Sequence, residues 1–458
     1  MWEAIRSNQR RSRWIVALMG LLLVGLGAAI GASWIGGTEG AALGAVMAVG
    51  LWLLLLTVSL TSGEQVILTT AGAKAIKKED APTLWNTVEE MTIAAGLPKM
   101  PSVHIIDTDI PNAFATGRKP ENSAIVVTAG LLKRLNRDEL QGVVAHEMAH
   151  IRNFDVRFLT IATVMVGAIV LLSDIFARSL WWGAGRRRGS SKGGQWATII
   201  ALVMALVAPL FANMLYYAVS RKREYLADAS AARFTRYPQG LASALQKIAG
   251  SAQQREHHRA FSRALAPMYI VNPLQAAGKS TSLFSTHPPT AKRIAVLEAM
   301  SGGAGFLDYE KAFKKVHGEG VLSRTVWEKE EPIRQRKASV EPDAKQAAIE
   351  RSRGVTDLLD RFAGMLLIPC VCGVRIKAPQ GTEATEIGCP RCERKHPIPR
   401  AEEEKTDVDH SKPLHFRRQS DGWESFACSC GKTHQLSPAL RVADIRCSEC
   451  SRQIRIES

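Results

Sequence analysis

The sequence predicts a mainly α-helical integral-membrane protein with a soluble α+β domain and two small cysteine modules at its C-terminal end. Three observations support this fold class: four long apolar runs in the first half, a mixed helix and strand pattern between residues 61 and 155, and eight cysteines that all follow residue 369. With 458 residues, the chain is long enough for two or three domains.

Each apolar run is long enough to cross a hydrocarbon core about 30 Å thick. The first run is too long for the apolar region of a cleaved signal peptide, and a second run follows at once, so we expect residues 1–60 to form a retained transmembrane hairpin. The later pair of runs lies within the next domain. The four runs cover residues 14–30, 41–60, 156–177 and 196–219.

Much of the net charge of +16 lies beside these runs. This placement favours the lipid bilayer as partner, and nucleic acid is not expected. The positive-inside rule predicts a multi-pass protein of the cell (cytoplasmic) membrane whose catalytic domain and C-terminal tail face the cytoplasm. A full second hairpin would place the basic loop at 186–192 outside, so either the last pair dips without crossing or packing overrides the charge bias.

Residues 61–155 read as a soluble α+β segment. A helix is expected at 81–97, and short strands at 101–107 and 122–132 flank "NAFATG". Asn136 and Glu139 form a capping-box signature at the start of a further helix. No proline or glycine follows Gly142, so this helix is expected to run directly into the third apolar run. Residues 323–365 read as a charged linker.

That capped helix carries "HEMAH", in which His146 and His150 are four residues apart. Such positions share a helix face, so both imidazoles can point to one place. Zinc binds nitrogen ligands at about 2.0–2.1 Å, and a catalytic zinc keeps one position for water. Glu147 is turned away from the ligand direction but can take a proton from that water, as the H-E-x-x-H pattern requires.

Two rival interpretations are weaker. Hydrogen-bonded helix histidines without a metal are disfavoured because the surrounding residues are apolar. A di-iron bundle needs a second E-x-x-H half-site, and the only other match lies among the cysteines. For the third ligand we expect Glu224, with Asp228 holding a ligand histidine or donating a proton. Taken alone, Glu224 and Asp228 fit surface carboxylates equally well.

Four motifs in order, "NAFATG", "HEMAH", "EYLAD" and "STHPPT", together with the apolar hairpins, resemble the HtpX-type membrane zinc metalloproteases, whose relatives include the CaaX prenyl proteases. The resemblance covers roughly residues 1–320 and implies a zincin-like (gluzincin) domain at 61–322 that includes the membrane segments 156–177 and 196–219. It departs from the family in a longer basic loop at 178–195 and in the C-terminal region.

The resemblance also implies roles for single residues. His146, His150 and Glu224 would bind the catalytic zinc, and Glu147 would be the acid/base. Asp228 would act as a proton donor, as in some relatives. His287 would stabilise the transition state, although it also fits a turn residue at a helix entry.

The implied activity is zinc-dependent endopeptidase cleavage of misfolded or damaged membrane proteins, which is a quality-control role. Substrate would add as a strand beside Asn112, Ala113, Phe114 and Ala115, although these residues also fit an ordinary loop. The alternative function is a catalytically silent membrane scaffold that recruits partners.

The cysteines form two sets with the same spacing, C-x-C-G followed by C-x-x-C. Four thiolates suit a closed zinc site, so we expect zinc ribbons at 366–400 and 424–458, with structural zinc in each and a possible protein partner. Disulfides are disfavoured in a reducing cytoplasm, and iron is a minor rival. The expected total is one catalytic and two structural zinc ions. The ligand sets are Cys370, Cys372, Cys389 and Cys392, and Cys428, Cys430, Cys447 and Cys450.

Overall fold

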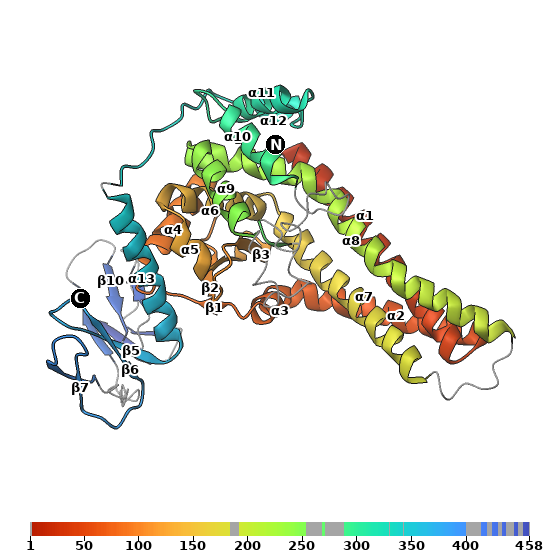
Figure 1. The fold of residues 1–458 in the computed structure, drawn as a ribbon, viewed down its shortest axis with the longest axis horizontal. Coiled ribbons are helices and arrows are strands. Elements are labelled where there is room, and N and C mark those ends of the chain that lie inside the picture. The colour runs from red at the N-terminus through yellow and green to blue at the C-terminus, as the bar shows by residue number, and fades with distance from the viewer. Residues whose placement is uncertain are drawn as a thin grey trace. The chain divides into compact units, whose positions relative to one another are not determined.

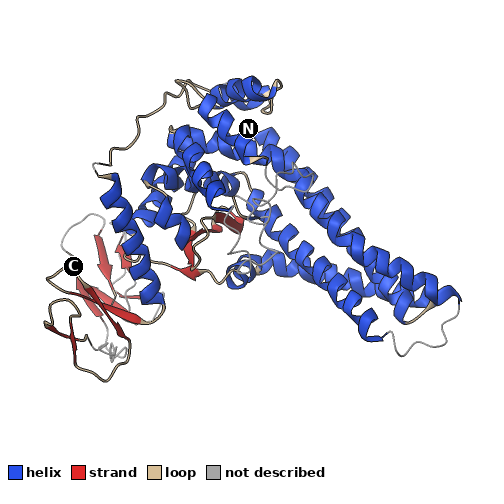
Figure 2. Ribbon diagram, viewed as in Figure 1, coloured by secondary structure: helices blue, strands red, loops and turns tan. Residues whose placement is uncertain are grey.

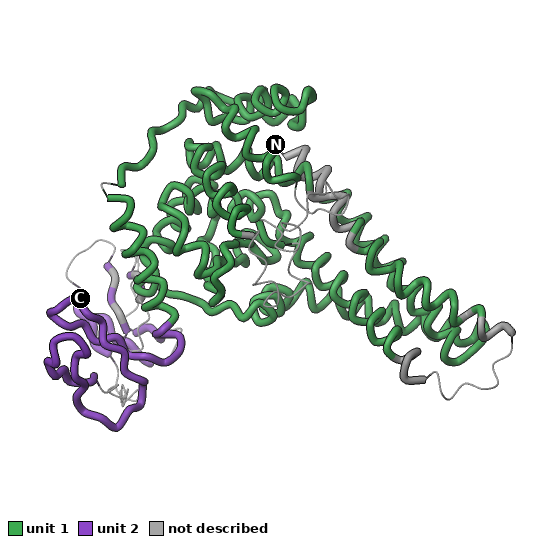
Figure 3. The backbone as a smooth tube through the Cα atoms, viewed as in Figure 1, with its two compact units in different colours: residues 1–359 green, residues 360–458 purple. Residues whose placement is uncertain are grey.

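The chain divides into two compact units, residues 1–359 and 360–458 (Figure 3). The computed structural model describes most of the first unit and a smaller share of the second. The described residues are 2–183, 192–252, 268–270, 288–328, 330–341, 343–399, 414–418, 424–428, 433–436, 444–447 and 452–457.

Four long helices of the first unit pack side by side (Figure 1). They are α1 (Trp2–Trp34), α2 (Gly37–Thr61), α7 (Asp155–Gly183) and α8 (Lys192–Thr235). Within the described residues, three apolar stretches are long enough to cross a membrane: Gln9–Trp34, Gly37–Thr61 and Asp155–Arg178. The fourth predicted run lies within α8, which continues through Pro209 and whose described apolar stretch, Thr198–Ala212, is shorter.

Helices α1 and α2 approach each other through glycines. A Cβ atom at Gly31 would lie 2.2 Å from the carbonyl oxygen of Gly40, and one at Gly44 would lie 2.2 Å from that of Gly27. Small residues let helix backbones come this close in a membrane, where van der Waals packing drives helix association. The N-terminal segment is therefore a tightly packed helical hairpin.

A four-stranded sheet lies beside these helices in the order β1-β2-β4-β3. The pair β2 and β4 is parallel, whereas β1–β2 and β3–β4 are antiparallel. Among the described residues, β3 is an edge strand, and it contains three of the four predicted substrate-binding residues, Ala113, Phe114 and Ala115. The strands are β1 (Lys74–Ala75), β2 (Ser102–Ile106), β3 (Ala113–Lys119) and β4 (Asn122–Thr128).

Helix α6 (Arg137–Arg152) carries the histidines and packs against α4, α8, α9 and β3. Its predicted capping box is confirmed: the Asn136 side chain accepts from the Glu139 N–H at 2.9 Å, and the Glu139 carboxylate accepts from the Asn136 N–H at 2.8 Å. The other helices of this unit are α3 (Gly63–Thr70), α4 (Pro82–Ala95), α5 (Ala129–Arg134), α9 (Pro238–Ala252), α10 (Thr290–Ala299), α11 (Phe306–His317) and α12 (Arg324–Trp327).

The prediction that α6 continues directly into the third apolar run is wrong. Helix α6 ends at Arg152, Phe154 takes a positive φ of 61°, and α7 begins at Asp155. A left-handed residue cannot continue an α-helix, so the chain turns there without any proline or glycine. The turn lets the Asp155 carboxylate reach back to His150 Nδ1, at 3.2 Å.

The charged stretch after α12 is attached to the first unit. Arg336 donates to the Asp138 carboxylate at 2.7 Å, and the Ser339 hydroxyl and N–H donate to the same carboxylate, each at 2.7 Å. Asp138 lies in the first turn of α6. Residues 330–341, which we call the strap, therefore bind the start of the histidine-bearing helix before α13 (Ala344–Phe362) begins.

The second unit is built of short strands (Figure 2). The two cysteine modules, which share a sequence spacing, also share the pairing of their strands. Across the C-x-C segments, Pro369 pairs with Arg375 and Ala427 with Thr433, and the partners are six positions apart in each case. Across the C-x-x-C segments, Gly388 pairs with Lys395 and Arg446 with Gln453, each seven positions apart. The strands are β5 (Met365–Pro369), β6 (Arg375–Pro379), β7 (Glu386–Gly388), β8 (Lys395–Pro397), β9 (Leu414–Arg417), β10 (Glu424–Ala427), β11 (Thr433–Leu436), β12 (Asp444–Arg446) and β13 (Gln453–Glu457).

Candidate active site

Helices α6 and α8 bring together three side chains that could bind a metal ion. His146 Nε2 and His150 Nε2 are 3.2 Å apart. One carboxylate oxygen of Glu224 lies 3.5 Å from His146 Nε2, and the other lies 3.3 Å from His150 Nε2. All three side chains are buried. The structure thus joins the two motif histidines to the carboxylate that the sequence favoured.

The spacing of these atoms fits a tetrahedral zinc ion. Ligands at about 2.0–2.1 Å from a tetrahedral centre lie about 3.3–3.4 Å from one another. The three observed separations, 3.2 to 3.5 Å, bracket that value. A zinc ion held by three such ligands keeps a fourth position for water or substrate.

The formal charges of the site also suit a divalent cation. Four buried carboxylates face two buried guanidinium groups, which leaves a net charge of −2 when both histidines are neutral. An uncompensated charge in a protein interior is costly, so a dication is a favourable occupant. The charged residues are Glu147, Asp155, Glu224, Asp228, Arg223 and Arg293.

Asp228 holds the first histidine. Its carboxylate lies 3.0 Å from His146 Nδ1, which leaves Nε2 for the metal. Arg293 of α10 clamps the same carboxylate at 2.6 and 2.8 Å. Burial alone would lower the pKa of His146, but the hydrogen bonds with Asp228 and Glu224 raise it. Although burial alone would raise the pKa of Asp228, the Arg293 guanidinium and the His146 contact lower it.

Asp155 holds the second histidine in the same way. It lies 3.2 Å from His150 Nδ1, and its other oxygen is 3.1 Å from Nη1 of the buried Arg223. The Arg223 guanidinium also lies 5.0 Å from the centre of the Phe158 ring, a cation–π distance. Each of the two histidines therefore contacts a carboxylate through Nδ1, and each carboxylate contacts a buried arginine.

The remaining predicted site residues are placed as follows. Glu147 is buried on α6, next to His146. Asn112 directly precedes β3, which contains Ala113, Phe114 and Ala115. His287 lies outside the described residues.

The sequence reasoning missed the supporting roles of Asp155, Arg223 and Arg293. Asp155 carries one signal, a carboxylate directly after the histidine helix. The arginines carry none, because nothing local distinguishes them from surface arginines.

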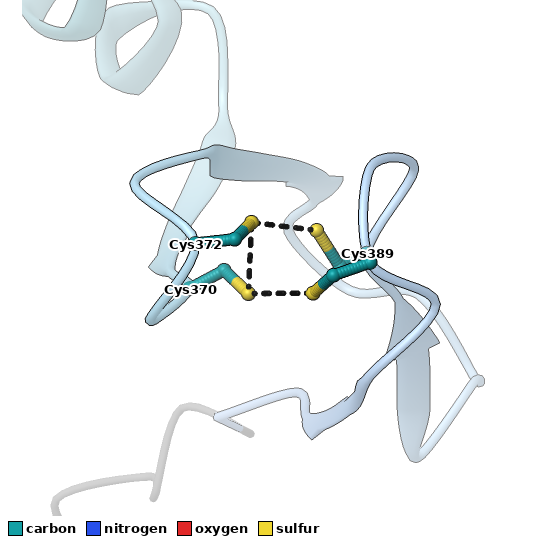
Figure 4. A group of neighbouring side chains, drawn as sticks. Cys370, Cys372 and Cys389 are labelled. Atoms are coloured by element: carbon teal, nitrogen blue, oxygen red, sulfur yellow. Dashed lines mark hydrogen bonds between the residues drawn. The ribbon is translucent and has the colours of Figure 1, made fainter.

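The first cysteine set is gathered at one place, as Figure 4 shows. Neighbouring sulfur atoms are 3.4 to 3.5 Å apart, and none of the four forms a disulfide. Sulfurs at about 2.3 Å from a tetrahedral zinc lie about 3.8 Å from one another, so a small adjustment would fit the ion. The set is Cys370, Cys372, Cys389 and Cys392.

The pKa shifts of two thiols in this set also favour a bound cation. The backbone N–H of Cys372 favours the Cys370 thiolate, yet hydrogen bonds with neighbouring thiols raise the pKa of Cys370 to about 12. The backbone N–H of Arg391 is the main cause that lowers the pKa of Cys389 to about 6. A nearby cation such as zinc would favour the thiolate forms of Cys370 and Cys389.

In the second set, Cys428 and Cys447 are buried, and Cys430 and Cys450 lie outside the described residues. One feature of the first set recurs here. The N–H of Cys389 donates to the carbonyl of Arg394 at 2.9 Å, and that of Cys447 donates to the carbonyl of Arg452 at the same distance. The first cysteine of each C-x-x-C segment therefore makes the same backbone hydrogen bond, five residues along the chain.

The chain is similar to known proteins over much of its length. The model of peptidase family M48 matches residues 78–301. The protease HtpX homolog of Dictyoglomus turgidum is 44% identical over 309 residues, covering 68% of this chain and 98% of that protein. That of Listeria monocytogenes is 42% identical over 311 residues, covering 66% and 100%. The crystal structure of S. mikatae Ste24p covers 55% of this chain and 57% of its own, at 20% identity and a TM-score of 0.33.

Proposed function

The chain belongs to peptidase family M48 as an HtpX-type metalloprotease with membrane helices, and we propose that it is a zinc-dependent endopeptidase that cleaves misfolded or damaged membrane proteins. The observation that carries the zinc assignment is the triangle of His146, His150 and Glu224, whose sides match tetrahedral ligand spacing. When bound, zinc would supply Lewis-acid polarisation of water and of the scissile carbonyl.

The protein residues would then move and hold protons. Glu147 accepts the proton of the attacking water and delivers it to the leaving amine. Asp228 and Asp155 keep His146 and His150 in the tautomer that leaves Nε2 free for the metal. His287 remains our candidate for transition-state stabilisation, and Asp228 acts through His146 rather than on the substrate.

Substrate would bind as an added strand along β3. Among the candidate residues Asn112, Ala113, Phe114 and Ala115, the backbone groups that point away from β4 would give affinity with loose sequence preference, which suits damaged proteins of many sequences. The ordered edge strand next to the histidine helix supports this placement.

An apolar stretch adjoins each group of proposed ligands, after the histidines in α7 and before Glu224 in α8, which supports a site at the membrane surface. Asp155, bound to His150, is the first residue of the apolar stretch Asp155–Arg178. Arg223 contacts Ser12 at 2.5 Å, so the basic start of α1 lies at the same end. By the positive-inside rule this end faces the cytoplasm of the cell membrane.

We further propose that each cysteine set is a structural zinc ribbon. Metal binding supplies folding energy that modules this small cannot obtain from a core. The cysteine geometry of the first set and the shared register of the second support this assignment. The ribbons are also the place where we would look for a protein partner.

The activity is tested with purified full-length protein and an unfolded casein substrate. We expect cleavage by the wild type and loss of cleavage in Glu147→Gln, with the exposed Glu89→Gln as the matched control. Cleavage that persists in Glu147→Gln would overturn the assignment and favour contamination or the silent scaffold.

The metal assignment is tested by elemental analysis. We expect about three zinc ions per chain in the wild type and one fewer in Glu224→Ala, because the ribbons keep theirs. An unchanged zinc content in Glu224→Ala would exclude Glu224 as the third ligand.

A further inference from the structure

Along strand β3, the backbone N–H and C=O groups point alternately toward β4 and away from it. The carbonyl of Asn112 accepts from the N–H of Thr128 at 3.0 Å, so residue 112 faces β4. In an antiparallel pair the next residues alternate, and the backbone groups of Ala113, Ala115 and Gly117 therefore point away from β4. A substrate strand added to this edge would have to use these outward groups.

Both ends of that edge are already engaged. At one end, Thr160 of α7 donates to the Gly117 carbonyl at 3.2 Å. At the other end, the N–H of Ile270 donates to the Ala113 carbonyl at 3.0 Å. Ala113 and Ala115 are 0% and 3% exposed. The predicted substrate edge is therefore closed in this structure.

The tripeptide Met268–Ile270 occupies one part of it. The Tyr269 ring packs edge-to-face on Phe114 of β3, with ring centres 5.3 Å apart. The carbonyl of Ile270 accepts from Arg293 Nη1 at 3.3 Å. Ile270 thus donates its N–H to β3, as a residue of an added strand would, whereas its carbonyl accepts from an arginine.

Arg293 connects this position to the metal site. The same guanidinium that meets Ile270 clamps Asp228, and Asp228 holds His146. Arg293 Nη1 also lies 3.6 Å from the Glu224 carboxylate, so a backbone carbonyl in the place of Ile270 is one side chain away from a candidate metal ligand. A substrate that reached the metal along β3 would run through this position.

We propose that Met268–Ile270 is an internal stand-in for the substrate backbone. The tripeptide holds the edge of β3 in the resting enzyme, and substrate displaces it, taking over the Ala113 carbonyl and an N–H of Arg293. This inference rests on the proposed proteolytic function and adds a step to it. Because only the displaced form binds, the apparent affinity for substrate is lowered by the fraction of molecules in that form.

Hydrogen exchange tests the displacement directly. The full-length Glu147→Gln protein, loaded with zinc, is compared with and without saturating β-casein, and exchange is measured in peptides that cover residues 268–270. We expect faster exchange there on casein binding, while the Thr128 amide in β4 stays protected. Slower or unchanged exchange at residues 268–270 would mean that the tripeptide is a fixed wall of the site, and it would overturn the proposal.

Kinetics give a second test that also separates this proposal from the function itself. Tyr269→Ala removes the Phe114 contact and should raise kcat/KM for casein by about 3- to 10-fold, because the displaced form is more populated. The exposed Ile93→Ala is the control and should match the wild type.

A fall in kcat/KM for Tyr269→Ala at unchanged zinc content would overturn the stand-in and leave the protease intact. If the wild type shows no cleavage that depends on Glu147, both the proposed protease function and the stand-in role of Met268–Ile270 are overturned. If Tyr269→Ala does not fold, the exchange experiment on Glu147→Gln decides alone.

Discussion

At the scale of single residues, the site consists of two parallel arrangements, His146–Asp228–Arg293 and His150–Asp155–Arg223. A carboxylate on Nδ1 fixes the tautomer and increases the basicity of Nε2, while the arginine offsets the charge of the buried carboxylate. The two histidines proposed as zinc ligands are therefore oriented by neighbouring carboxylates and arginines.

Asp155→Asn tests this arrangement. An amide can rotate and no longer carries charge, so we expect zinc affinity at the histidine site to fall about 10- to 100-fold. Competition with a zinc chelator measures the change. The control is Asp174→Asn, which removes an exposed partner of Arg178. Equal affinity in wild type and Asp155→Asn would mean that the Asp155 contact does not support the ligand.

The histidines and their supporting residues differ in how far sequence reasoning can reach. His146, Glu147 and His150 were predictable because helical geometry places residues four apart on one face. The role of Arg293 was not predictable, because Arg293 and Asp228, which are hydrogen-bonded, lie 65 residues apart and no periodic pattern links them. The Asp155 contact depends on a helix break at Phe154 that no proline or glycine marks.

At the scale of elements, the α1–α2 hairpin depends on backbone contact. Gly31→Leu would place a side chain against the Gly40 carbonyl, and we expect a loss of about 1–3 kcal/mol of stability from overpacking. Thermal unfolding in detergent measures the loss. Gly50→Leu is the matched control, since a Cβ atom there meets nothing within 4 Å. Equal destabilisation by both substitutions would refute close packing of this hairpin.

The strap is a second element whose contribution can be measured. Arg336→Ala removes the guanidinium from the buried Asp138 carboxylate, and we expect a cost of about 1.5–3 kcal/mol. The exposed pair of Arg324 and Glu328 supplies the control, because Arg324→Ala should cost less than about 1 kcal/mol. Chemical unfolding of the first unit distinguishes the two, and similar costs would make the strap a loosely attached linker.

The strap contact should also depend on pH. Burial alone would raise the pKa of Asp138, but hydrogen bonds from Arg336 and Ser339 lower it below its ordinary value of 3.8. A lowered carboxyl pKa contributes stability that is complete above the ordinary value and is lost as pH falls through the folded value. The Tm difference between wild type and Arg336→Ala should be constant from about pH 6 to 8 and narrow below about pH 4. A difference that persists in acid would assign the effect to packing of the Arg336 side chain.

At the scale of the whole molecule, the candidate metal site is built on the same helices that carry the apolar stretches. Glu224 lies on the helix that contains the apolar stretch Thr198–Ala212, and Asp155 begins the stretch Asp155–Arg178. Sequence reasoning could predict the helices from their apolar length, and the cysteine repeat from its spacing. It could not predict that the strap returns to Asp138, because that contact joins residues about 200 positions apart and depends on tertiary packing.

A substitution in one unit should therefore remove zinc from that unit and leave the zinc of the other unit in place. The histidine triangle lies wholly within residues 1–359, and the first cysteine set lies wholly within 360–458. Cys389→Ser should remove about one zinc ion per chain and leave Glu147-dependent cleavage of casein unchanged, because three remaining thiolates cannot close a structural site. Glu224→Ala should remove one zinc ion together with cleavage. A parallel loss of zinc and cleavage in Cys389→Ser would instead make the ribbon part of the catalytic machinery, with zinc content and initial rate measured on the same samples.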